Sequence, residues 1–374
     1  MTQSIAFIDL AAQRRRIARE IDSAIARVID RGIFISGPEV AAFETKLAAF
    51  CGARFAVACG NGTDALQLAL MAKGIGQGDA VIVPDFTFTA TAEAVALVGG
   101  TPVFVDVQAT DFNIDVGQLE AGIGAARNKG LKPRALIAVD LFGLAADYDA
   151  LNAFCDANGL LLIADAAQSF GAVLCGRKVG TLAPITTTSF FPAKPLGCYG
   201  DGGAILTDDE DLVATLKSLR VHGQGTDKYD NVRIGMNSRL DTIQAAILMC
   251  KLDIFADEIK ARQTVAARYA GALANRVLTP TVSNDAVSVW AQYTVRIPDS
   301  RRNEVAQKLK AAGVPTAIYY PKPLHQQTAY RHFPATGSLA VSQRLSGEVL
   351  SLPMHPYLES ATQERIVTAI VDAT

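Results

Sequence analysis

Residues 134–165 read RALIAVDLFGLAADYDALNAFCDANGLLLIAD, and this stretch decides the fold class. It opens with an apolar run at 135–139, continues with helical spacing at 148–159, and closes with a second apolar run at 160–165. Because neither run alternates polar and apolar residues, both faces of each strand are expected to be buried. Two such strands joined by a helix predict a parallel sheet with helices on both of its faces.

The same pattern extends in both directions along the chain. The leading helices are expected at 12–31 and after the turn formed by Gly37 and Pro38. The strands and helices that follow are FAVACG (55–60), TDALQLALMAKG (63–74), AVIVP (80–84), PVFVDV (102–107), TTTSFF (186–191), GGAILTD (202–208) and DEDLVATLKSLRV (209–221). This alternation predicts an α/β fold built on a mostly parallel central sheet that is covered by helices.

The remainder of the chain predicts a second, smaller domain. A long helical stretch at 240–274 is followed by the strand QYTVRI (292–297) and the helix RRNEVAQKLKAAG (301–313). A chain of 374 residues is longer than one hydrophobic core usually serves. We therefore expect a large α/β domain over 1–254 and a small C-terminal α+β domain over 255–374.

The composition argues against several classes of partner. The formal net charge of -2 gives no electrostatic basis for binding nucleic acid or an anionic membrane. The sequence contains no uncharged apolar run of about 18 residues and no signal-peptide pattern at its start. The six cysteines form no C-x-x-C pair, which favours buried thiols in the cytoplasm over disulfides or a metal site.

Lys194 is the first candidate for catalysis. It lies in SFFPAKPLGCYGDGG (189–203), after a short strand, between two prolines and before a glycine-rich turn. Prolines restrict a loop, and glycines let the backbone approach a ligand closely. A lysine held in this way can form an imine when burial lowers its pKa. The alternative is an ordinary solvated lysine, which Lys194 by itself does not exclude.

Asp165 is the second candidate, because it ends the apolar run GLLLIAD (159–165). Ligands bind beyond the carboxyl ends of strands in open α/β sheets, and a carboxylate buried there is costly unless it is paired. The protonated nitrogen of a pyridinium ring is a suitable partner, since the charged ring can accept the electrons of a carbanion. Gln168 could reach the oxygen of the same ring. The alternatives are a cap or a structural ion pair for Asp165 and a turn cap for Gln168.

The segment GNGTDAL (60–66) predicts a phosphate site between an apolar strand and a helix. Backbone amides at a helix N-terminus, here near Gly62, bind phosphate, and the hydroxyl of Thr63 can add a hydrogen bond. This segment alone is ambiguous, because helix N-termini often have no ligand.

A dinucleotide site is the rival interpretation of the same residues. The spacing Gly60-x-Gly62-x-x-Ala65 fits the dinucleotide fingerprint, and Asp85, 20 residues beyond Ala65, could bind a ribose. An NAD-dependent oxidoreductase is therefore an alternative function. Asp85 follows a proline, however, so it is expected in a turn past the strand. The rival function also leaves Lys194 without a role.

Four further residues are weaker candidates for ligand binding. Phe88 in PDFTFTAT could stack on a planar ring, and Ser189 could donate to a phosphate. Asn237 and Arg239 lie in GMNSRLD (235–241), in a turn before a helix. The alternatives are a core position for Phe88, and capping or surface charge for the two residues of the turn.

Five segments in this order resemble the DegT/DnrJ/EryC1/StrS family of nucleotide-sugar aminotransferases. They are GNGTDAL (60–66), PDFTFTATAEAV (84–95), ADAAQSFGA (164–172), SFFPAKPLGCYGDGGA (189–204) and GMNSRLDTIQAA (235–246). The resemblance spans essentially the whole chain, from FIDLAAQ (7–13) to LSLPMHP (350–356). An ordered set of five motifs is far more specific than any one of them.

The resemblance implies a fold-type I transferase that depends on pyridoxal 5'-phosphate. By this analogy Lys194 carries the cofactor as a Schiff base and Asp165 pairs with the nitrogen of its ring. Gln168 approaches the ring oxygen, and Phe88 stacks on the ring. Some relatives have histidine in place of this lysine and are sugar dehydratases, so Lys194 favours transamination.

The resemblance also implies a homodimer whose active sites lie at the subunit interface. Gly62, Thr63 and Ser189 are then expected to hold the phosphate of the cofactor, with Asn237 reaching it from the other subunit. A non-catalytic sensor on the same fold is a third interpretation of the chain. A sensor, however, has no need for an imine-forming lysine.

The reaction implied by the resemblance has two halves. L-glutamate gives up its amino group and leaves as 2-oxoglutarate, and a ketosugar nucleotide then accepts the amino group. The wording SFFPAKPLGCYGDGGA is most similar to enzymes acting on UDP-2-acetamido-2-deoxy-3-oxo-glucuronate, which serve bacterial surface-polysaccharide synthesis. Many relatives have asparagine in place of Pro195 and act on TDP- or UDP-linked 3-keto or 4-keto deoxysugars, which are the alternative substrates.

Substrate contacts are expected from cations, because glutamate and a uronate both carry carboxylates. Arg239, Lys228 and Arg233 are the candidates, with Arg239 preferred for its place beside Asn237. Tyr320 and His325, in YYPKPLH (319–325), are further candidates. For each of these residues an ordinary surface role is the alternative.

Overall fold

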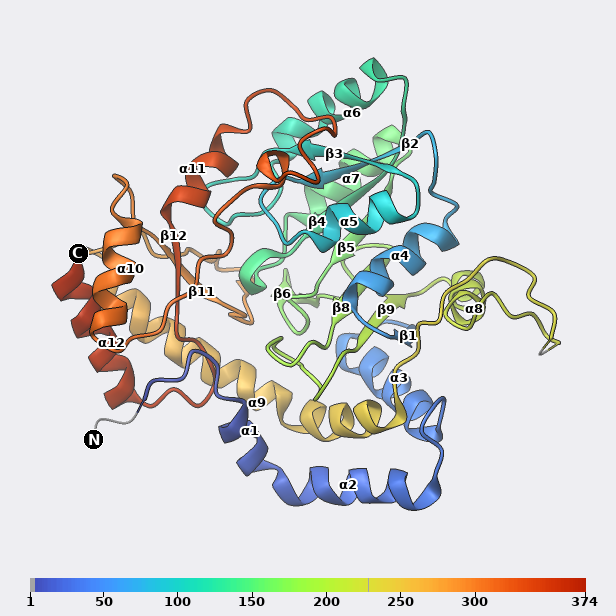
Figure 1. The fold of residues 1–374 in the computed structure, drawn as a ribbon, viewed down its shortest axis with the longest axis horizontal. Coiled ribbons are helices and arrows are strands. Elements are labelled where there is room, and N and C mark those ends of the chain that lie inside the picture. The colour runs from blue at the N-terminus through green and yellow to red at the C-terminus, as the bar shows by residue number, and fades with distance from the viewer. Residues whose placement is uncertain (1–3, 228) are drawn as a thin grey trace.

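The computed structural model describes residues 4–227 and 229–374, and its centre is one large sheet (Figure 1). Within these residues the sheet has seven strands in the order β1-β9-β8-β5-β4-β2-β3. They are β1 (Phe55–Cys59), β2 (Asp79–Pro84), β3 (Thr101–Val105), β4 (Lys132–Val139), β5 (Leu161–Asp165), β8 (Ile185–Ser189) and β9 (Gly203–Thr207).

The pairing of the strands is mostly parallel, as the sequence predicts. β3, β2, β4, β5 and β8 are parallel neighbours, with Val139 opposite Asp165 where β4 and β5 end. β9 is antiparallel to both β1 and β8. It follows β8 after one loop and returns beside it, and only antiparallel neighbours can be joined without a long crossover. That loop carries Lys194.

Helices cover both faces of the sheet, which explains why strands such as β4 and β5 have buried apolar residues on both sides. Ala135 and Ile137 of β4 belong to a core with residues of α4, α5 and α8, whereas Leu136 and Ala138 pack with α6 and α7. Alternate residues of a strand point to opposite faces, so each face has its own helical layer. These helices are α4 (Gly62–Ala72), α5 (Ala90–Leu97), α6 (Leu119–Asn128), α7 (Tyr148–Asn158) and α8 (Glu210–Leu219).

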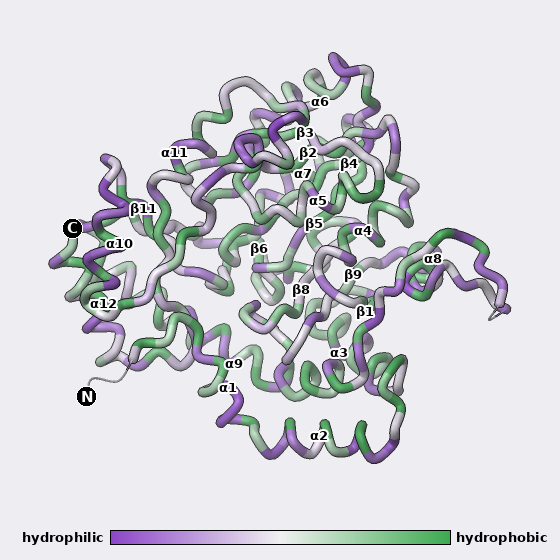
Figure 2. The backbone as a smooth tube through the Cα atoms, viewed as in Figure 1, coloured by the Kyte–Doolittle hydropathy of each residue, from purple (hydrophilic) through white to green (hydrophobic). Residues whose placement is uncertain are grey.

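The first helices differ from the expectation of one helix over 12–31. The structure has α1 (Leu10–Arg16) and α2 (Ala18–Arg31), separated at Ile17, whose φ of -127° and ψ of 35° are not helical. Apolar and polar residues alternate along α2 in Figure 2, and its apolar side packs on the long helix α9 (Thr242–Leu273). α3 (Pro38–Cys51) follows and also packs on α9.

The C-terminal part forms a separate apolar cluster to the left of the sheet in Figure 1. It contains α10 (Arg302–Ala311), α12 (Ser360–Ala373) and the antiparallel pair β11 (Tyr293–Arg296) and β12 (Val349–Leu352). The second half of α9 and Ile5 also belong to this cluster. The expected boundary after residue 254 therefore lies inside α9, and the division into 1–254 and 255–374 stays a prediction.

The remaining elements are short or lie at the edge of the sheet. α11 (Ala340–Glu348) starts near β3, and Pro334 of the preceding segment accepts a hydrogen bond from Phe104. A small sheet is formed by β10 (Ala286–Val287), β6 (Val173–Leu174) and β7 (Arg177–Lys178), and three 3₁₀ turns cover Val116–Gln118, Leu141–Gly143 and Leu324–Gln326. No helix in the described part of the chain is long and apolar enough to span a bilayer.

Candidate active site

Asp165 lies at the carboxyl end of β5, in the middle of the sheet, and is only 7% exposed. Its Oδ2 accepts a hydrogen bond from Thr91 Oγ1 (3.1 Å), and its Oδ1 accepts one from the Ala167 N–H (3.2 Å). Burial raises the pKa of this carboxyl group, while the Ala167 N–H, the charge of Lys194 and Thr91 lower it. These partners keep a buried carboxylate available for a cationic ligand.

Lys194 lies in the loop between β8 and β9, close enough to Asp165 for the two charges to interact. The Lys194 N–H donates to the carbonyl of Phe191 (2.8 Å), which closes a turn around the lysine. Burial lowers the pKa of the Lys194 amine, and the attraction of Asp165 opposes this shift. A lowered pKa supplies more of the neutral amine that attacks a carbonyl. The structure thus brings the two principal candidates together.

Gln168 is held in a fixed orientation by two partners. Its Oε1 accepts from the Phe142 N–H (2.8 Å), and its Nε2 donates to the hydroxyl of Tyr320 (3.2 Å). Among the described residues the second amide hydrogen has no partner. Gln168 can therefore donate to an oxygen of a bound ring, and Tyr320 joins the site from the C-terminal part of the chain.

Phe88 is 53% exposed, so it is not the core aromatic of the alternative interpretation. Its ring centroid lies 6.2 Å from that of Tyr320, and the two planes are inclined by 39°. A large apolar face that stays open to solvent is available for stacking on a planar ligand.

The predicted phosphate residues also meet. α4 begins at Gly62, and Asn61 caps it by accepting from the Asp64 N–H (2.8 Å). The first N–H groups of a helix have no partner within the helix, so those of Gly62 and Thr63 can face an anion. A Cβ built on Gly62 would lie 2.7 Å from Cβ of Ser189. Gly62 and Ser189 are therefore in direct contact, as a shared phosphate site requires.

Of the expected substrate cations, Arg233 and Arg239 lie on or beside a projecting segment of the chain. Arg239 Nη2 donates to Oδ1 of Asn237 (2.5 Å), and Asn237 is exposed. Arg233 is also exposed, in the loop after α8 that extends away from the molecule in Figure 1. Lys228 falls outside the described residues. The roles of these four residues stay predictions.

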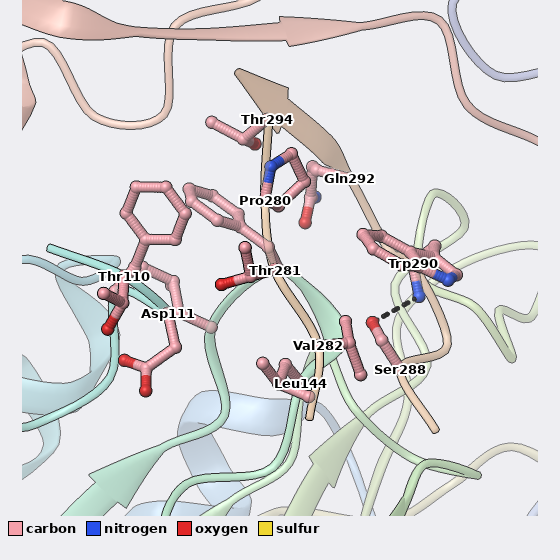
Figure 3. A pocket seen from close by; sticks show the side chains of 13 residues that line it. Thr110, Asp111, Leu144, Pro280, Thr281, Val282, Ser288, Trp290, Gln292 and Thr294 are labelled. Atoms are coloured by element: carbon pink, nitrogen blue, oxygen red, sulfur yellow. Dashed lines mark hydrogen bonds between the residues drawn. The ribbon is translucent and has the colours of Figure 1, made fainter. Parts of the chain in front are cut away.

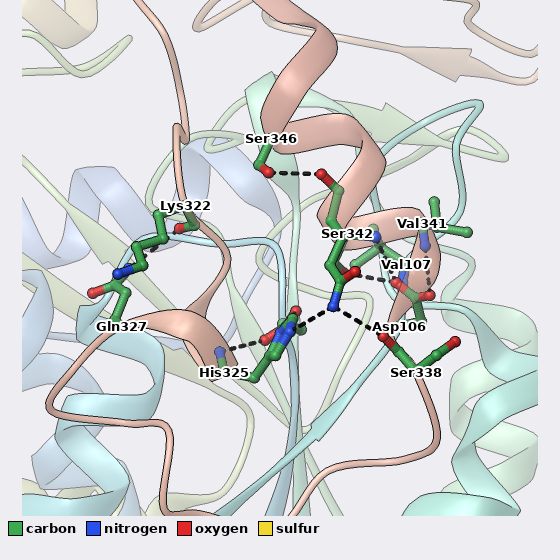
Figure 4. A network of polar contacts seen from close by, with 11 residues as sticks. Asp106, Val107, Lys322, His325, Gln327, Ser338, Val341, Ser342 and Ser346 are labelled. Atoms are coloured by element: carbon green, nitrogen blue, oxygen red, sulfur yellow. Dashed lines mark hydrogen bonds and ion pairs between the residues drawn. The ribbon is translucent and has the colours of Figure 1, made fainter.

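His325 has structural partners on both ring nitrogens (Figure 4). Its Nδ1 lies 2.7 Å from Oδ2 of Asp85, its backbone N–H donates to Asp85 Oδ1 (2.8 Å), and its Nε2 lies 3.0 Å from Nε2 of Gln343. The hydrogen bonds of His325 do not support its predicted role in substrate binding, which stays a prediction. Asp85 is fully buried, so it cannot bind a ribose as the rival dinucleotide site requires.

Sequence reasoning missed two residues that support the site. Thr91 lies in the segment that contains Phe88, but nothing in its spacing indicated that it would bond to Asp165. Asp140 follows β4 as Asp165 ends β5, and it is fully buried with donors in Ser169 Oγ (2.6 Å), Tyr148 Oη (2.8 Å) and the Ala146 N–H (2.9 Å). Burial raises its pKa to about 7. The apolar run before Asp140 was a usable signal.

The cavity of Figure 3 shares Phe142 with the surroundings of Gln168 and is too small for a cofactor. Its volume of about 20 Å³ suits roughly one water molecule. Phe142, whose N–H holds Gln168, forms part of its wall, and Gln292 Oε1 in the same wall has no partner among the described residues. The cavity is therefore a packing feature next to the site.

Comparisons with known proteins agree with this geometry. The family described as the DegT/DnrJ/EryC1/StrS aminotransferase family matches residues 15–371. The chain belongs to this family. A relative from Pseudomonas aeruginosa, UDP-2-acetamido-2-deoxy-3-oxo-D-glucuronate aminotransferase, is 48% identical over 98% of this chain and 100% of its own length. A crystal structure of a DegT/DnrJ/EryC1/StrS aminotransferase from Brucella abortus is 52% identical, with a TM-score of 0.96 over 98% of both chains.

Membership of the DegT/DnrJ/EryC1/StrS family makes the protein a transaminase that depends on pyridoxal phosphate. A third structure, NtdA from Bacillus subtilis, is described with bound cofactor PMP. It is 29% identical, with a TM-score of 0.87 over 95% of this chain and 81% of that chain. Both the transaminase activity and the cofactor predicted from the sequence are confirmed, and the oxidoreductase and sensor alternatives are wrong.

The residues of this chain fit the cofactor of the family. A Cβ at Gly62 would fill the space against Ser189 at the N-terminus of α4, where a phosphate would bind. Asp165 is a buried acid with two donors, and Gln168 keeps one amide hydrogen available. Lys194 has the lowered pKa that imine formation needs. An acid, an amide donor, a phosphate site and an amine are the groups that a pyridoxal phosphate ring requires.

Proposed function

We propose that this enzyme transfers the amino group of L-glutamate to the 3-keto group of UDP-2-acetamido-2-deoxy-3-oxo-glucuronate, giving the 3-amino sugar. The relative from Pseudomonas aeruginosa, which aligns over its full length, supports this substrate. The observation that carries the chemistry is the partly buried Lys194 amine beside the buried Asp165 carboxylate. A TDP- or UDP-linked 3-keto or 4-keto deoxysugar is the alternative acceptor.

Each side chain of the site has a separate role in the proposed reaction. When bound, the cofactor supplies a carbonyl that takes the amino group and a ring that accepts electrons. Lys194 would move the proton at the α-carbon of the donor, since burial lowers the pKa of its amine and makes the neutral base more available. Asp165 holds the ring nitrogen, Gln168 donates to the ring oxygen, and Phe88 covers the ring. The N-terminus of α4 and Ser189 bind the phosphate.

We propose that the active enzyme is a homodimer with shared active sites. The segment Ile33–Ile35 exposes three large apolar side chains, and Ile234 in the projecting loop is 88% exposed. Phe34 O accepts from the Thr242 N–H (2.9 Å), so the first of these surfaces lies beside the turn of Asn237. Exposed apolar patches of this kind usually mark an interface. A second copy would cover them and would bring Asn237 to the neighbouring phosphate.

We further propose that the carboxylate of the uronate is bound by Arg239, with Lys228 and Arg233 as additional cations. Arg239 is half-buried beside Asn237, and a guanidinium pairs with a carboxylate in two parallel hydrogen bonds. We place the enzyme in the cytoplasm, since its six cysteines are all unpaired thiols, as expected in a reducing compartment. Its partners are then small molecules and a second copy of itself.

A half-reaction assay tests the proposed donor and the role of Lys194. The cofactor-loaded protein should convert L-glutamate to 2-oxoglutarate with loss of the cofactor absorbance, and Lys194→Ala should abolish both changes. Lys260→Ala, an exposed lysine on α9, is the matched control and should behave as wild type. Turnover of glutamate by Lys194→Ala would overturn the assignment of Lys194.

A panel of ketosugars then tests the acceptor. The aminated form of the enzyme should regain the original absorbance fastest with the UDP-linked 3-oxo-uronate. It should react more slowly with the UDP-linked 3-oxo sugar that lacks the carboxylate. Arg239→Met should remove this preference, because it deletes the cation without removing the rest of the site. Faster recovery with a TDP-linked deoxysugar would favour the alternative substrate class.

A further inference from the structure

We propose that Lys251 and Gln244 of α9 are positioning residues that hold the loop carrying Lys194. This inference rests on the proposed role of Lys194 as the residue that moves the proton. Gln244 lies in the segment GMNSRLDTIQAA (235–246) but has no predicted role there, and Lys251 lies outside the five segments. Both nevertheless bond to the backbone of that loop from one side of the helix.

The loop is closed at its base and turns tightly around Lys194. The Cys198 N–H donates to the carbonyl of Phe190 (2.8 Å), and the Lys194 N–H donates to the carbonyl of Phe191 (2.8 Å). A Cβ on Gly197 would lie 2.5 Å from the carbonyl oxygen of Pro192, so the two limbs of the loop touch. One limb continues β8 and is fixed by the sheet. The other limb runs into β9, where the Phe190 N–H donates to the carbonyl of Gly202 (2.7 Å), and between Gly197 and Tyr199 it is bonded to side chains of α9.

Lys251 anchors this second limb at Gly197. Its Nζ donates to the Gly197 carbonyl (2.6 Å) and lies 4.2 Å from the ring centroid of Tyr199. The side chain is 1% exposed, and among the described residues no carboxylate lies within ion-pair distance of it. Burial lowers its pKa to about 8. The charges of Cys198 and Glu258 oppose this shift, but neither forms an ion pair with the amine in the described part of the chain. A buried lysine without an ion pair costs stability, and its hydrogen bond to the loop partly offsets that cost.

Gln244 anchors the same limb two residues further on. Its Oε1 accepts from the Tyr199 N–H (2.8 Å), and its amide also lies against Gly200. Gln244 and Lys251 are seven residues apart in α9, and positions at this spacing lie on the same side of a helix. Two side chains on one side of a helix therefore hold the loop at Gly197 and at Tyr199.

The consequence for catalysis is geometric. The amine of Lys194 has to reach the α-carbon of the donor, while Asp165 is proposed to hold the nitrogen at the far end of the cofactor ring. A displacement of about 1 Å in such a group can cost about a hundredfold in rate. Loss of either anchor should therefore slow proton transfer strongly while leaving the binding of donor almost unchanged.

The test measures the half-reaction with L-glutamate in the cofactor-loaded enzyme, with rates divided by the amount of bound cofactor. Lys251→Met keeps the length and packing of the side chain and removes the hydrogen bond. Gln244→Leu removes the acceptor, whereas Gln244→Glu keeps it. Lys260→Met is the matched control, being the same substitution at an exposed site of the same helix.

We expect Lys251→Met and Gln244→Leu to lower the maximal rate per bound cofactor roughly 10- to 100-fold, with little change in KM. Gln244→Glu and Lys260→Met should remain close to wild type. With α-deuterated glutamate the isotope effect in the two slow variants should be no smaller than in wild type, because proton transfer limits them. If Lys251→Met does not fold, the comparison of Gln244→Leu with Gln244→Glu still tests whether α9 positions the loop.

Rates per bound cofactor in Lys251→Met and Gln244→Leu that equal those of Lys260→Met would overturn the inference. The inference would also be overturned if these two variants lost activity only because they bind less cofactor. Lys194→Ala separates this outcome from failure of the proposed function. If Lys194→Ala is inactive while both anchor variants are normal, only the anchoring role fails. If Lys194→Ala still converts glutamate, the role of Lys194 itself fails.

Discussion

Substituting Gly62 by alanine should weaken cofactor binding through a single methyl group. A Cβ at this position would lie 2.7 Å from Cβ of Ser189, 3.2 Å from its Oγ and 3.3 Å from its Cα. The Ser189 hydroxyl can rotate, but its Cα and Cβ are fixed by the backbone at the end of β8, so either β8 or the N-terminus of α4 has to move. Both elements are expected to bind the phosphate.

The magnitude follows from the cost of overpacking, which is typically about 1–3 kcal/mol. The protein without cofactor can relieve the contact by moving Ser189 or the start of α4. The cofactor requires both in place, so most of the cost should appear in its dissociation constant. At about 1.4 kcal/mol per tenfold, the expected loss of affinity is roughly 5- to 150-fold.

Titration of the cofactor-free protein with pyridoxal phosphate measures this loss, and pyridoxal without phosphate serves as the internal control. Gly124→Ala is the matched substitution, because Gly124 lies in α6 and a Cβ added there would have nothing within 4 Å. Equal affinities for Gly62→Ala and Gly124→Ala would refute the reasoning.

Three further predictions follow from other contacts of the structure. Thr91→Val removes the hydroxyl that donates to Asp165, so the pKa of that carboxyl should rise further and the affinity for pyridoxal phosphate should fall about 10-fold or more in the same titration. For Asp140, burial raises the pKa from 3.8 to about 7, so the folded state holds a proton that the unfolded state loses. Its contribution to stability is full below pH 3.8 and is lost as the pH rises toward 7. The urea concentration at the midpoint of unfolding should therefore fall less between pH 5 and pH 8 in Asp140→Asn than in wild type. An equal fall in the two proteins would contradict the raised pKa of Asp140 as its cause. Ile234→Asp places a charge on an exposed apolar residue of the proposed interface, so sedimentation should show a shift from dimer to monomer together with loss of activity; a variant that remains an active dimer would remove Ile234 from the interface.

The sequence by itself determined the class of the fold and indicated the two principal candidates of the site. Unbroken apolar runs such as 135–139 are buried on both faces, so they could only be inner strands of a sheet covered by helices. A carboxylate at the end of such a run, as in Asp165, has to lie at the ligand-binding edge. Lys194 was identifiable because its prolines and glycines mark an ordered loop. The fold class and these two candidates follow from the local residue pattern and from the order of the segments along the chain.

Tertiary structure alone decided which distant residues meet. Thr91 bonds to Asp165 across 74 positions, Tyr320 meets Gln168 across 152, and His325 pairs with Asp85 across 240. No periodicity encodes such pairs, because they depend on the order of strands and on how the C-terminal segment returns to the sheet. For the same reason the role of α9 beneath the Lys194 loop could not be predicted. Spacing along a helix shows which side chains share a face, but only the packed structure shows what that face contacts.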